Sequence, residues 1–276
     1  MNPHAAQPTS LASLIGNLWR HRQLISQMTK REVIGRYKGS VMGLLWSFAN
    51  PILLLAMYTI VFSVVFKARW GTGEPASKAE FAVLLFAGMI VHSLFAETLI
   101  RAPSLILTNV SYVKKIVFPL EILPVVAMGT SVFHAIVSVL VLTAALVLLN
   151  GVLPWTAIFL PLVLIPLIVL SLGIAWALAS LGVFLRDVAQ PIGLAMTVLL
   201  FASPVFYPLS ALPESVQPWL MLNPLTFIIE QARAVLIHGQ PPDARGLLVY
   251  ALVSLVVAWV GYAWFQKTRK GFANVL

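Results

Sequence analysis

Glu97 and Arg101 are residues of this sequence whose type and spacing could carry chemistry. They stand four residues apart near the end of an apolar stretch, 81–100, that contains one further ionisable residue, His92. Side chains at this spacing share a helix face, and ionisable groups inside a membrane segment are functional candidates by default. The alternative is a structural role, in which Arg101 extends its side chain to the membrane interface and pairs with the nearby Glu97 carboxylate. We expect Glu97 and Arg101 to pair structurally, and His92 and His134 to make helix-packing hydrogen bonds.

Motifs of several enzyme classes are missing from the sequence. It has no GxxxxGK[ST] pattern, so it cannot hold nucleotide phosphates in a P-loop. It has no HExxH, no cysteine and no cluster of histidines with carboxylates, so we expect no metal site and no catalytic thiol. The nine Asp and Glu residues are scattered, which argues against acid/base catalysis at a membrane face. We therefore expect no catalytic residue in this chain.

The composition is that of a membrane protein. Hydrophobic residues make up 60% and charged residues 10% of the 276 residues, and the mean hydropathy is +0.94. Soluble domains carry about a quarter charged residues, so a soluble enzyme is excluded, as is a disordered chain. The net charge of +9 is typical of loops that face the cytoplasm and anionic lipid, and does not indicate nucleic-acid binding.

Uncharged runs predict an all-α integral membrane protein with six transmembrane helices, because about 20 residues cross a hydrocarbon core of about 30 Å. The expected spans are 41–66, 81–100, two spans within 122–185 joined by a turn at Asn150 and Gly151, 188–207, and 246–266. Between spans five and six, prolines interrupt an apolar segment that is too short to cross. We expect a pair of short re-entrant or surface helices there, the second with Asn223 as its N-cap and Gly239 at its end.

Residues 1–38 are expected to form an N-terminal extension and an amphipathic helix, and residues 39–276 the six-span domain. Apolar residues recur at helical spacing from Leu11 to Met28 with basic residues on other faces, which favours a helix in the membrane interface over one packed on a soluble partner. Thirteen Lys and Arg residues fall on one side of the predicted membrane and five on the other. This asymmetry predicts that both termini are cytoplasmic.

Three glycines mark the joint between the amphipathic helix and span one. Gly35, Gly39 and Gly43, followed by Ser47, repeat every four residues. Small residues at this spacing permit close contact between membrane helices, whereas a flexible joint is an equally good interpretation. We assign Gly35, Gly39, Gly43 and Trp46, together with Glu97 and Arg101, to a gate or helix joint.

Four motifs in a fixed order resemble the transmembrane subunit of type-2 ABC exporters, in the branch that exports lipid-linked polysaccharides. The resemblance covers roughly Lys30 to Lys270. The motifs are Arg36-Tyr37-Lys38-Gly39-Ser40 with Leu44-Leu45-Trp46 and Asn50-Pro51, Lys114-Lys115-Ile116-Val117-Phe118-Pro119 with Glu121 and Pro124, Arg186-Asp187, and Asn223-Pro224-Leu225 with Glu230 and Arg233.

The resemblance implies a homodimer of this chain in a bacterial inner membrane, docked on two copies of a separate ABC ATPase that binds ATP and Mg. It implies that residues 104–112 form a coupling helix against that ATPase. It also implies that Arg186-Asp187, in the next cytoplasmic loop, makes a second contact with the ATPase. The residues assigned to this coupling surface are Ser104, Leu105, Ile106, Asn109, Tyr112, Lys114, Lys115, Arg186 and Asp187. The implied cargo is lipid-linked polysaccharide, with O antigen expected and capsular polysaccharide or teichoic acid as alternatives.

Aromatic residues near the outer ends of spans one and five are candidates for a sugar path. Sugar faces stack on aromatic rings, and few charges are wanted along such a path. The candidates are Tyr58, Phe62, Phe66, Phe201, Phe206, Tyr207 and Trp219. An aromatic belt at the lipid interface is the competing interpretation.

Two other classes of function stay open at this point. A secondary transporter is expected to show repeat symmetry and broken helices, and no convincing repeat is present. A membrane-embedded glycan or acyl transferase would show its activity without a partner ATPase.

Overall fold

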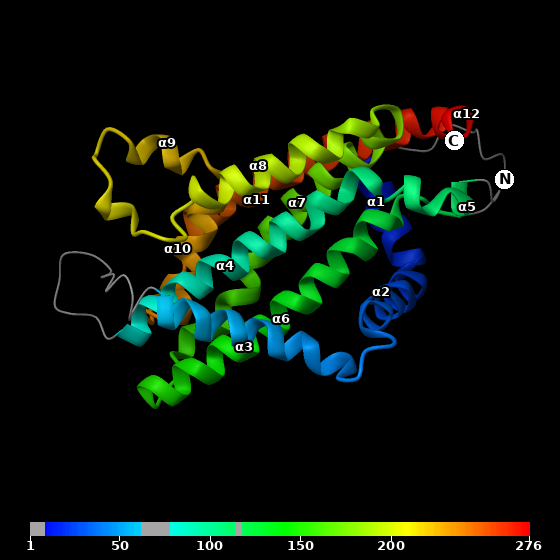
Figure 1. Ribbon diagram of the computed structural model, residues 1–276. Coiled ribbons are helices and arrows are strands. Elements are labelled where there is room, and N and C mark those ends of the chain that lie inside the picture. The colour runs from blue at the N-terminus through cyan, green and yellow to red at the C-terminus, as the bar shows by residue number, and fades with distance from the viewer. Residues whose placement is uncertain (1–8, 62–77, 114–117) are drawn as a thin grey trace.

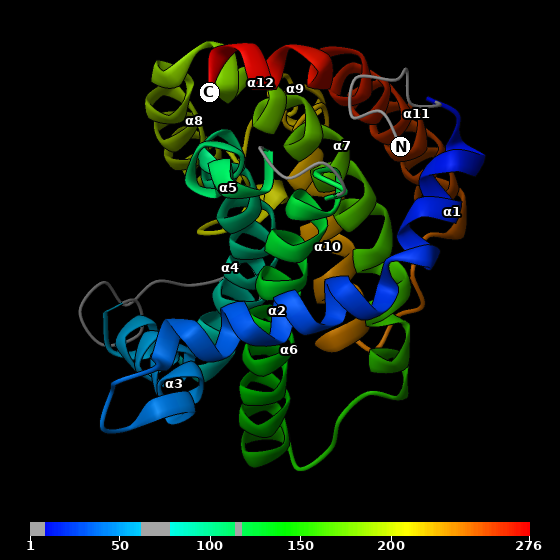
Figure 2. The same cartoon turned by 90° about the vertical axis from the view of Figure 1, so that its right-hand side faces the viewer.

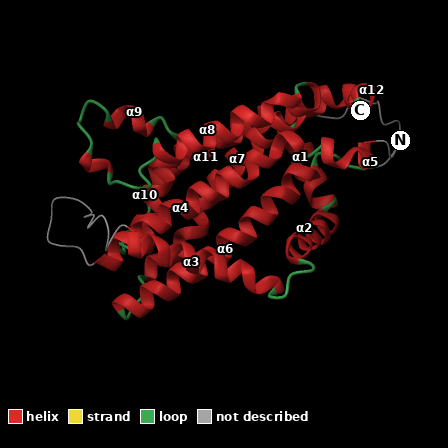
Figure 3. Ribbon diagram, in the orientation of Figure 1, coloured by secondary structure: helices red, strands yellow, loops and turns green. Residues whose placement is uncertain are grey.

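The computed structural model describes residues 9–61, 78–113 and 118–276, and everything regular within those ranges is helical (Figures 1 and 3). The all-α prediction is therefore confirmed for these ranges. In chain order the elements are α1 (Leu11–Arg20), α2 (Arg22–Tyr37), η1 (Gly43–Leu45), α3 (Trp46–Tyr58), α4 (Lys78–Arg101), η3 (Ala102–Ser104), η4 (Leu107–Asn109), α5 (Val110–Val113), α6 (Ile122–Asn150), η5 (Trp155–Phe159), α7 (Leu160–Phe184), η6 (Arg186–Val188), α8 (Ala189–Phe201), η7 (Leu209–Ala211), α9 (Gln217–Met221), α10 (Pro224–Leu236), α11 (Ala244–Thr268), η8 (Arg269–Gly271) and α12 (Phe272–Val275).

Within the described residues, five helical segments are long and apolar enough to cross a membrane. They are Gly43–Val61, Phe81–Ser104, Ile122–Leu149, Trp155–Phe184 and Ala244–Val275, and they match five of the six predicted spans. The remaining prediction, 188–207, contains the 13-residue α8. At 1.5 Å per residue α8 is about 20 Å long, which is less than the hydrocarbon core of about 30 Å. The five candidate spans define a multi-pass membrane protein.

Helix α4 is the centre of the bundle. Most of its apolar side chains are buried, and α6, α7, α8 and α10 all pack against it. The closest helix pair is α7 with α11, where a Cβ on Gly261 would lie 1.9 Å from the carbonyl oxygen of Gly173. Such close backbone approach is possible only between small residues. It is typical of membrane helices, because apolar surface gains little from association inside lipid and close packing holds the helices together instead.

The N-terminal region forms two helices where one amphipathic helix was predicted. They meet at His21, and α2 then crosses α6, where Thr29 contacts Gly129 (Figure 2). The chain turns after α2 at Gly39 and Gly43, whose φ angles are +89° and +51°. A Cβ placed on Gly35 or on either of these glycines would meet no atom of the described chain within 4 Å. Within the described residues, Gly39 and Gly43 therefore turn the chain, and none of the three glycines makes a helix contact.

The turn predicted after α6 and the caps predicted for α10 are confirmed. Gly151 ends α6 with a φ of +74°, and the Asn223 side chain caps α10 by accepting from the backbone N–H of Leu225 at 2.9 Å. Gly239 follows α10 with a φ of +65°. Helices α9 and α10 are the expected pair of short helices before the last span.

The bundle has two ends, which are named here by their short helices (Figure 1). The α5/α12 end holds α1, η3, η6 and the end of α11, and the α9/α10 end holds the α6–α7 turn. Leu14 of α1 and Phe272 of α12 belong to one buried apolar cluster, so the first and last described helices lie at the same end.

Candidate functional site

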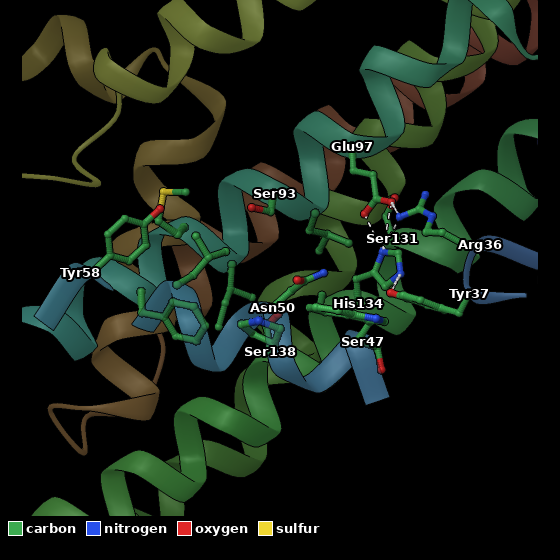
Figure 4. Close-up of a pocket in the computed structure, with 18 of the residues that line it drawn as sticks. Arg36, Tyr37, Ser47, Asn50, Tyr58, Ser93, Glu97, Ser131, His134 and Ser138 are labelled. Carbon is green, nitrogen blue, oxygen red and sulfur yellow. Dashed lines mark hydrogen bonds and ion pairs between the residues drawn. The ribbon is translucent and has the colours of Figure 1, made fainter. Parts of the chain in front are cut away.

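A polar cluster lies where α2, α4 and α6 meet. The Glu97 carboxylate is 2.7 Å from the Arg36 guanidinium and 3.0 Å from Nδ1 of His134, and the Tyr37 hydroxyl is 3.3 Å from Nε2 of the same ring (Figure 4). With Nδ1–H donating to Glu97, Nε2 accepts from the Tyr37 hydroxyl, and the Arg36 guanidinium, which also lies 3.2 Å from Nδ1, donates to Glu97 instead. Burial raises the pKa of Tyr37, and its neighbours act in opposite directions, Arg36 lowering it and Glu97 raising it. The phenol therefore stays protonated and can donate.

The expected pairing of Glu97 with Arg101 is wrong. Arg101 forms its ion pair with Glu32 of α2, while Glu97 pairs with Arg36 one turn further along the same helix. The reason is tertiary, because α2 lies across the bundle and offers each side chain of α4 an oppositely charged partner. Two ion pairs thus fasten the N-terminal region to the central helix.

Both predicted histidine contacts cross between helices. Nε2 of His92 lies 3.0 Å from the backbone oxygen of Met196, which ties α4 to α8. His134 ties α6 to α4 through Glu97. The helix-packing prediction is confirmed for His92, and for His134 it is confirmed as part of a larger polar cluster.

The polar cluster forms one end of a cavity of about 460 Å³ between α3, α4 and α6. Ser131 of α6 lies beside the cluster and Tyr58 lies at the opposite end (Figure 4), and Trp46 of α3 also lines the cavity. Asn50, Ser93 and Ser138 face it between these ends. Trp46 was predicted at a helix joint and Tyr58 on a sugar path, and the structure brings both to one cavity.

The predicted coupling segment is at the α5/α12 end and consists of short turns. Leu105 and Ile106 are buried in the chain's own core, Ile106 completely. Their expected place on a docking surface is therefore wrong: an amphipathic turn buries its apolar side, and α7 covers that side here. Thr108 and Ser111 are the exposed residues of the segment.

The other predicted coupling residues lie around that turn or outside the described chain. Ser104, Asn109 and Tyr112 are half-buried, and Tyr112 stacks on Phe118 with ring centroids 4.2 Å apart. Lys114 and Lys115 lie outside the described residues. Arg186 and Asp187 are exposed on η6, which contacts η3, so the two predicted cytoplasmic contacts are neighbours.

Within the described chain, the predicted path aromatics separate into one group of three and two single residues. Phe206 stacks on Phe201 at 5.5 Å, and the Tyr207 hydroxyl donates to the Phe201 carbonyl at 3.1 Å, so these three gather after α8. Tyr58 is in the cavity, and Trp219 is 73% exposed on α9. Phe62 and Phe66 lie outside the described residues.

Arg233 of α10 is a buried clamp at the α9/α10 end. It is 1% exposed and donates to the backbone oxygens of Leu84, Pro204 and Val205 at 2.6–3.0 Å, and to Glu230 at 3.0 Å. Burial lowers its pKa to about 10, while Glu230 acts to raise it. The side chain stays charged at neutral pH and joins α10 to α4 and to the segment after α8. The sequence marked Arg233 in a motif but not this role.

Glu121 is a second buried charge, at the α5/α12 end. Its carboxylate accepts from Arg269 at 2.8 Å and from Asn17 at 3.3 Å, and its carbonyl accepts from the Trp176 indole at 2.9 Å. The start of α6 is thereby joined to α1, α7 and the end of α11. Sequence reasoning missed the pair with Arg269 because 148 residues separate the two partners.

Neither buried charge belongs to a metal site. Within residues 9–61, 78–113 and 118–276, no group of three or more histidine or carboxylate side chains could hold a metal ion. The polar groups are instead organised for helix packing and for lining a cavity.

Five spans, a polar cavity among three of them and exposed turns at one end define a membrane-embedded transport subunit. The chain belongs to the ABC-2 type transporter family, whose profile matches residues 23–237. It is 29% identical over 263 residues to the O-antigen export system permease protein RfbA of Myxococcus xanthus, which covers 95% of this chain and 98% of that protein. It is 25% identical over 254 residues to a protein of the same name from Klebsiella pneumoniae, with 92% and 95% covered.

Proposed function

We propose that this chain is the permease of an ABC exporter that moves O antigen, attached to its lipid carrier, across the bacterial inner membrane to the periplasm. The observation that carries the proposal is similarity along nearly the whole chain to O-antigen export permeases of two distantly related bacteria. The polar cavity among apolar spans supports transport of a hydrophilic cargo, because lipid-facing helices alone have no need of it.

Gene deletion tests this function directly. Loss of the chain should remove O antigen from surface lipopolysaccharide and leave lipid-linked glycan inside the cell, and a plasmid copy should restore the surface polymer. Loss of a capsule or of wall teichoic acid with normal O antigen would assign the cargo to that polymer. Unchanged surface polymers of all three kinds would refute export.

We infer six crossings, with α8 and the turns after it as the fifth. Helix α8 runs beside α4 from the α5/α12 end toward the α9/α10 end (Figure 1). Helices α1 and α12 lie at the same end, which requires an even number of crossings. The excess of basic residues predicts that this end is cytoplasmic.

Single cysteines test the orientation, since the natural sequence has none. Gly151→Cys and Gln240→Cys should react with a membrane-impermeant thiol reagent in intact spheroplasts. Asn109→Cys and Lys270→Cys should react only after lysis. The reverse pattern would invert the topology, and reaction of Lys270→Cys together with Gly151→Cys would contradict the even number of crossings.

The complex is proposed to contain two copies of this chain and two copies of an ABC ATPase that holds ATP and Mg. The sequence lacks a P-loop, and the exposed turns of η4, α5 and η6 at one end offer a surface for a nucleotide-hydrolysing partner. The sugar path is proposed to run between protomers, with the group of aromatics after α8 at its outer end. Tyr207→Leu should lower export with normal expression, whereas Trp219→Leu should not if Trp219 belongs to an interfacial belt.

A further inference from the structure

The cavity between α3, α4 and α6 contains polar groups to which the described residues supply no hydrogen-bond partner. Asn50, Ser93 and Ser138 line it and make no side-chain hydrogen bond to any described residue. Ser93 is exposed although it lies in α4, the most buried helix of the bundle. The helix thus presents a hydroxyl to this space.

These groups lie within membrane-crossing segments, where an unpaired polar group is costly. Asn50, Ser93 and Ser138 belong to three different candidate spans. Hydrocarbon offers no hydrogen bond, so an amide or hydroxyl that faced lipid tails would lose its hydrogen bonds to water, as a buried unsatisfied group does. The cavity must therefore be filled by water or by a polar ligand. Its volume of about 460 Å³ is within the usual range of ligand sites, about 300–1,000 Å³.

The charges around the cavity select an uncharged ligand. Glu97 is the carboxylate that lines it, and Arg36 and His134 both hold that carboxylate. Because the Glu97 carboxylate balances the Arg36 charge, this pair leaves no surplus positive charge. A phosphate or diphosphate would meet the Glu97 carboxylate and would have to break its pair with Arg36, whereas a sugar hydroxyl can donate to the free lone pairs of the carboxylate.

The remaining lining fits the same ligand. Trp46 and Tyr58 are also lining residues of the cavity, and aromatic faces stack on the C–H faces of pyranose rings. Asn50, Ser93 and Ser138 add donors and acceptors between the rings. Alternating apolar faces and hydroxyl partners are the two surfaces that a neutral saccharide presents.

We propose that this cavity is a binding site for an uncharged segment of the exported glycan, located inside one protomer and separate from the path between protomers. The inference rests on the proposed export function. Glu97 accepts sugar hydroxyls there, and Arg36 and His134 are positioning residues that keep the carboxylate ionised and oriented. Because Arg36 and Tyr37 end α2, the site also senses the position of the N-terminal helices.

Cysteine labelling tests first whether the cavity is wet. In the complete complex with its ATPase, reconstituted in lipid nanodiscs, Ser93→Cys and Ser138→Cys should react with a charged methanethiosulfonate reagent. A thiol needs water to ionise. Ile136→Cys and Leu140→Cys are matched controls, because they flank Ser138 on α6, point away from the cavity and are more than half exposed on the apolar surface. Equal, slow reaction of all four cysteines would show a dry cavity and overturn the proposal.

The second measurement identifies the ligand. The glycan released by mild acid from the strain's own lipopolysaccharide should slow labelling of Ser93→Cys and Ser138→Cys at least tenfold, and inorganic diphosphate should not. Asn50→Ala should raise the glycan concentration needed for half protection by severalfold, as expected for loss of one neutral hydrogen bond. Protection by diphosphate alone, or no protection by glycan in a complex that exports O antigen, would overturn the inference. Failure of the proposed export function would be seen separately, because the deletion strain would then keep its surface O antigen.

Discussion

Replacing Arg233 with methionine should destabilise the protein strongly, because three backbone oxygens depend on this one side chain. Arg233→Met keeps a long, flexible side chain but removes all donors to Leu84, Pro204 and Val205. A hydrogen bond from a charged donor contributes about 1.5–3 kcal/mol, and a buried acceptor left without a partner costs about 1–3 kcal/mol. These terms overlap, so the expected loss is about 3–5 kcal/mol, as for breaking other buried ionic contacts.

Two further variants separate the carbonyl contacts from the ion pair. Glu230→Gln removes the acidic partner, which is 38% exposed, and an exposed pair is worth about 0–1 kcal/mol, so this matched control should be nearly neutral. Arg233→Lys should fall between the two, because an ammonium group cannot reproduce the planar fork of a guanidinium.

The assay is the melting temperature of the purified complex in detergent, measured as the loss of the monodisperse size-exclusion peak after heating. At about 2–4 °C per kcal/mol for chains of this size, Arg233→Met should melt on the order of 10 °C lower. If Arg233→Met melts within 2 °C of the natural protein, or if Glu230→Gln loses as much as Arg233→Met, the clamp is not a stabilising element and this reasoning fails.

Three further outcomes are expected at the α5/α12 end. Thr108→Arg should weaken binding of the partner ATPase in a pull-down and lower export while leaving the melting temperature unchanged. Ile106→Asp should instead prevent accumulation of folded protein, because Ile106 is completely buried. Equal loss of folded protein in both variants would contradict the assigned surface. Arg269→Met should lower the melting temperature by an amount equivalent to about 3–5 kcal/mol, since it leaves the buried Glu121 carboxylate without its cation, and an unchanged melting temperature would argue against this pair. Gly182→Ala should reduce both stability and export, because its Cβ would lie 2.0 Å from the carbonyl oxygen of Pro103, while Gly16→Ala, with open space around it, serves as the control for a glycine replacement.

Local features of the fold were readable because each depends on a few adjacent residues. Asn223, Pro224 and Gly239 predicted the start and end of α10, and Gly151 predicted the turn after α6, since capping and left-handed backbone geometry depend on residue type. The apolar runs predicted six spans, and five of them match helices long enough to cross, because crossing a membrane is a requirement on consecutive residues.

Partnerships between distant residues were not readable. Helical spacing favoured a Glu97–Arg101 pair, but α2 crosses the bundle and supplies Arg36 and Glu32 as closer partners. Hydrophobicity placed Leu105 on an amphipathic turn without telling which side faces another protein and which faces the chain's own α7.

By itself, the sequence determined that this protein is helical, embedded in a membrane, without its own nucleotide site and related to polysaccharide exporters. The tertiary structure decided where its few polar groups meet. It placed Glu97, His134 and Arg36 in one cluster at the end of a cavity, and it buried Arg233 against three carbonyls of other segments. The physical reason is that hydrophobic periodicity is a property of neighbouring residues, whereas the partner of a buried charge depends on which helices pack together.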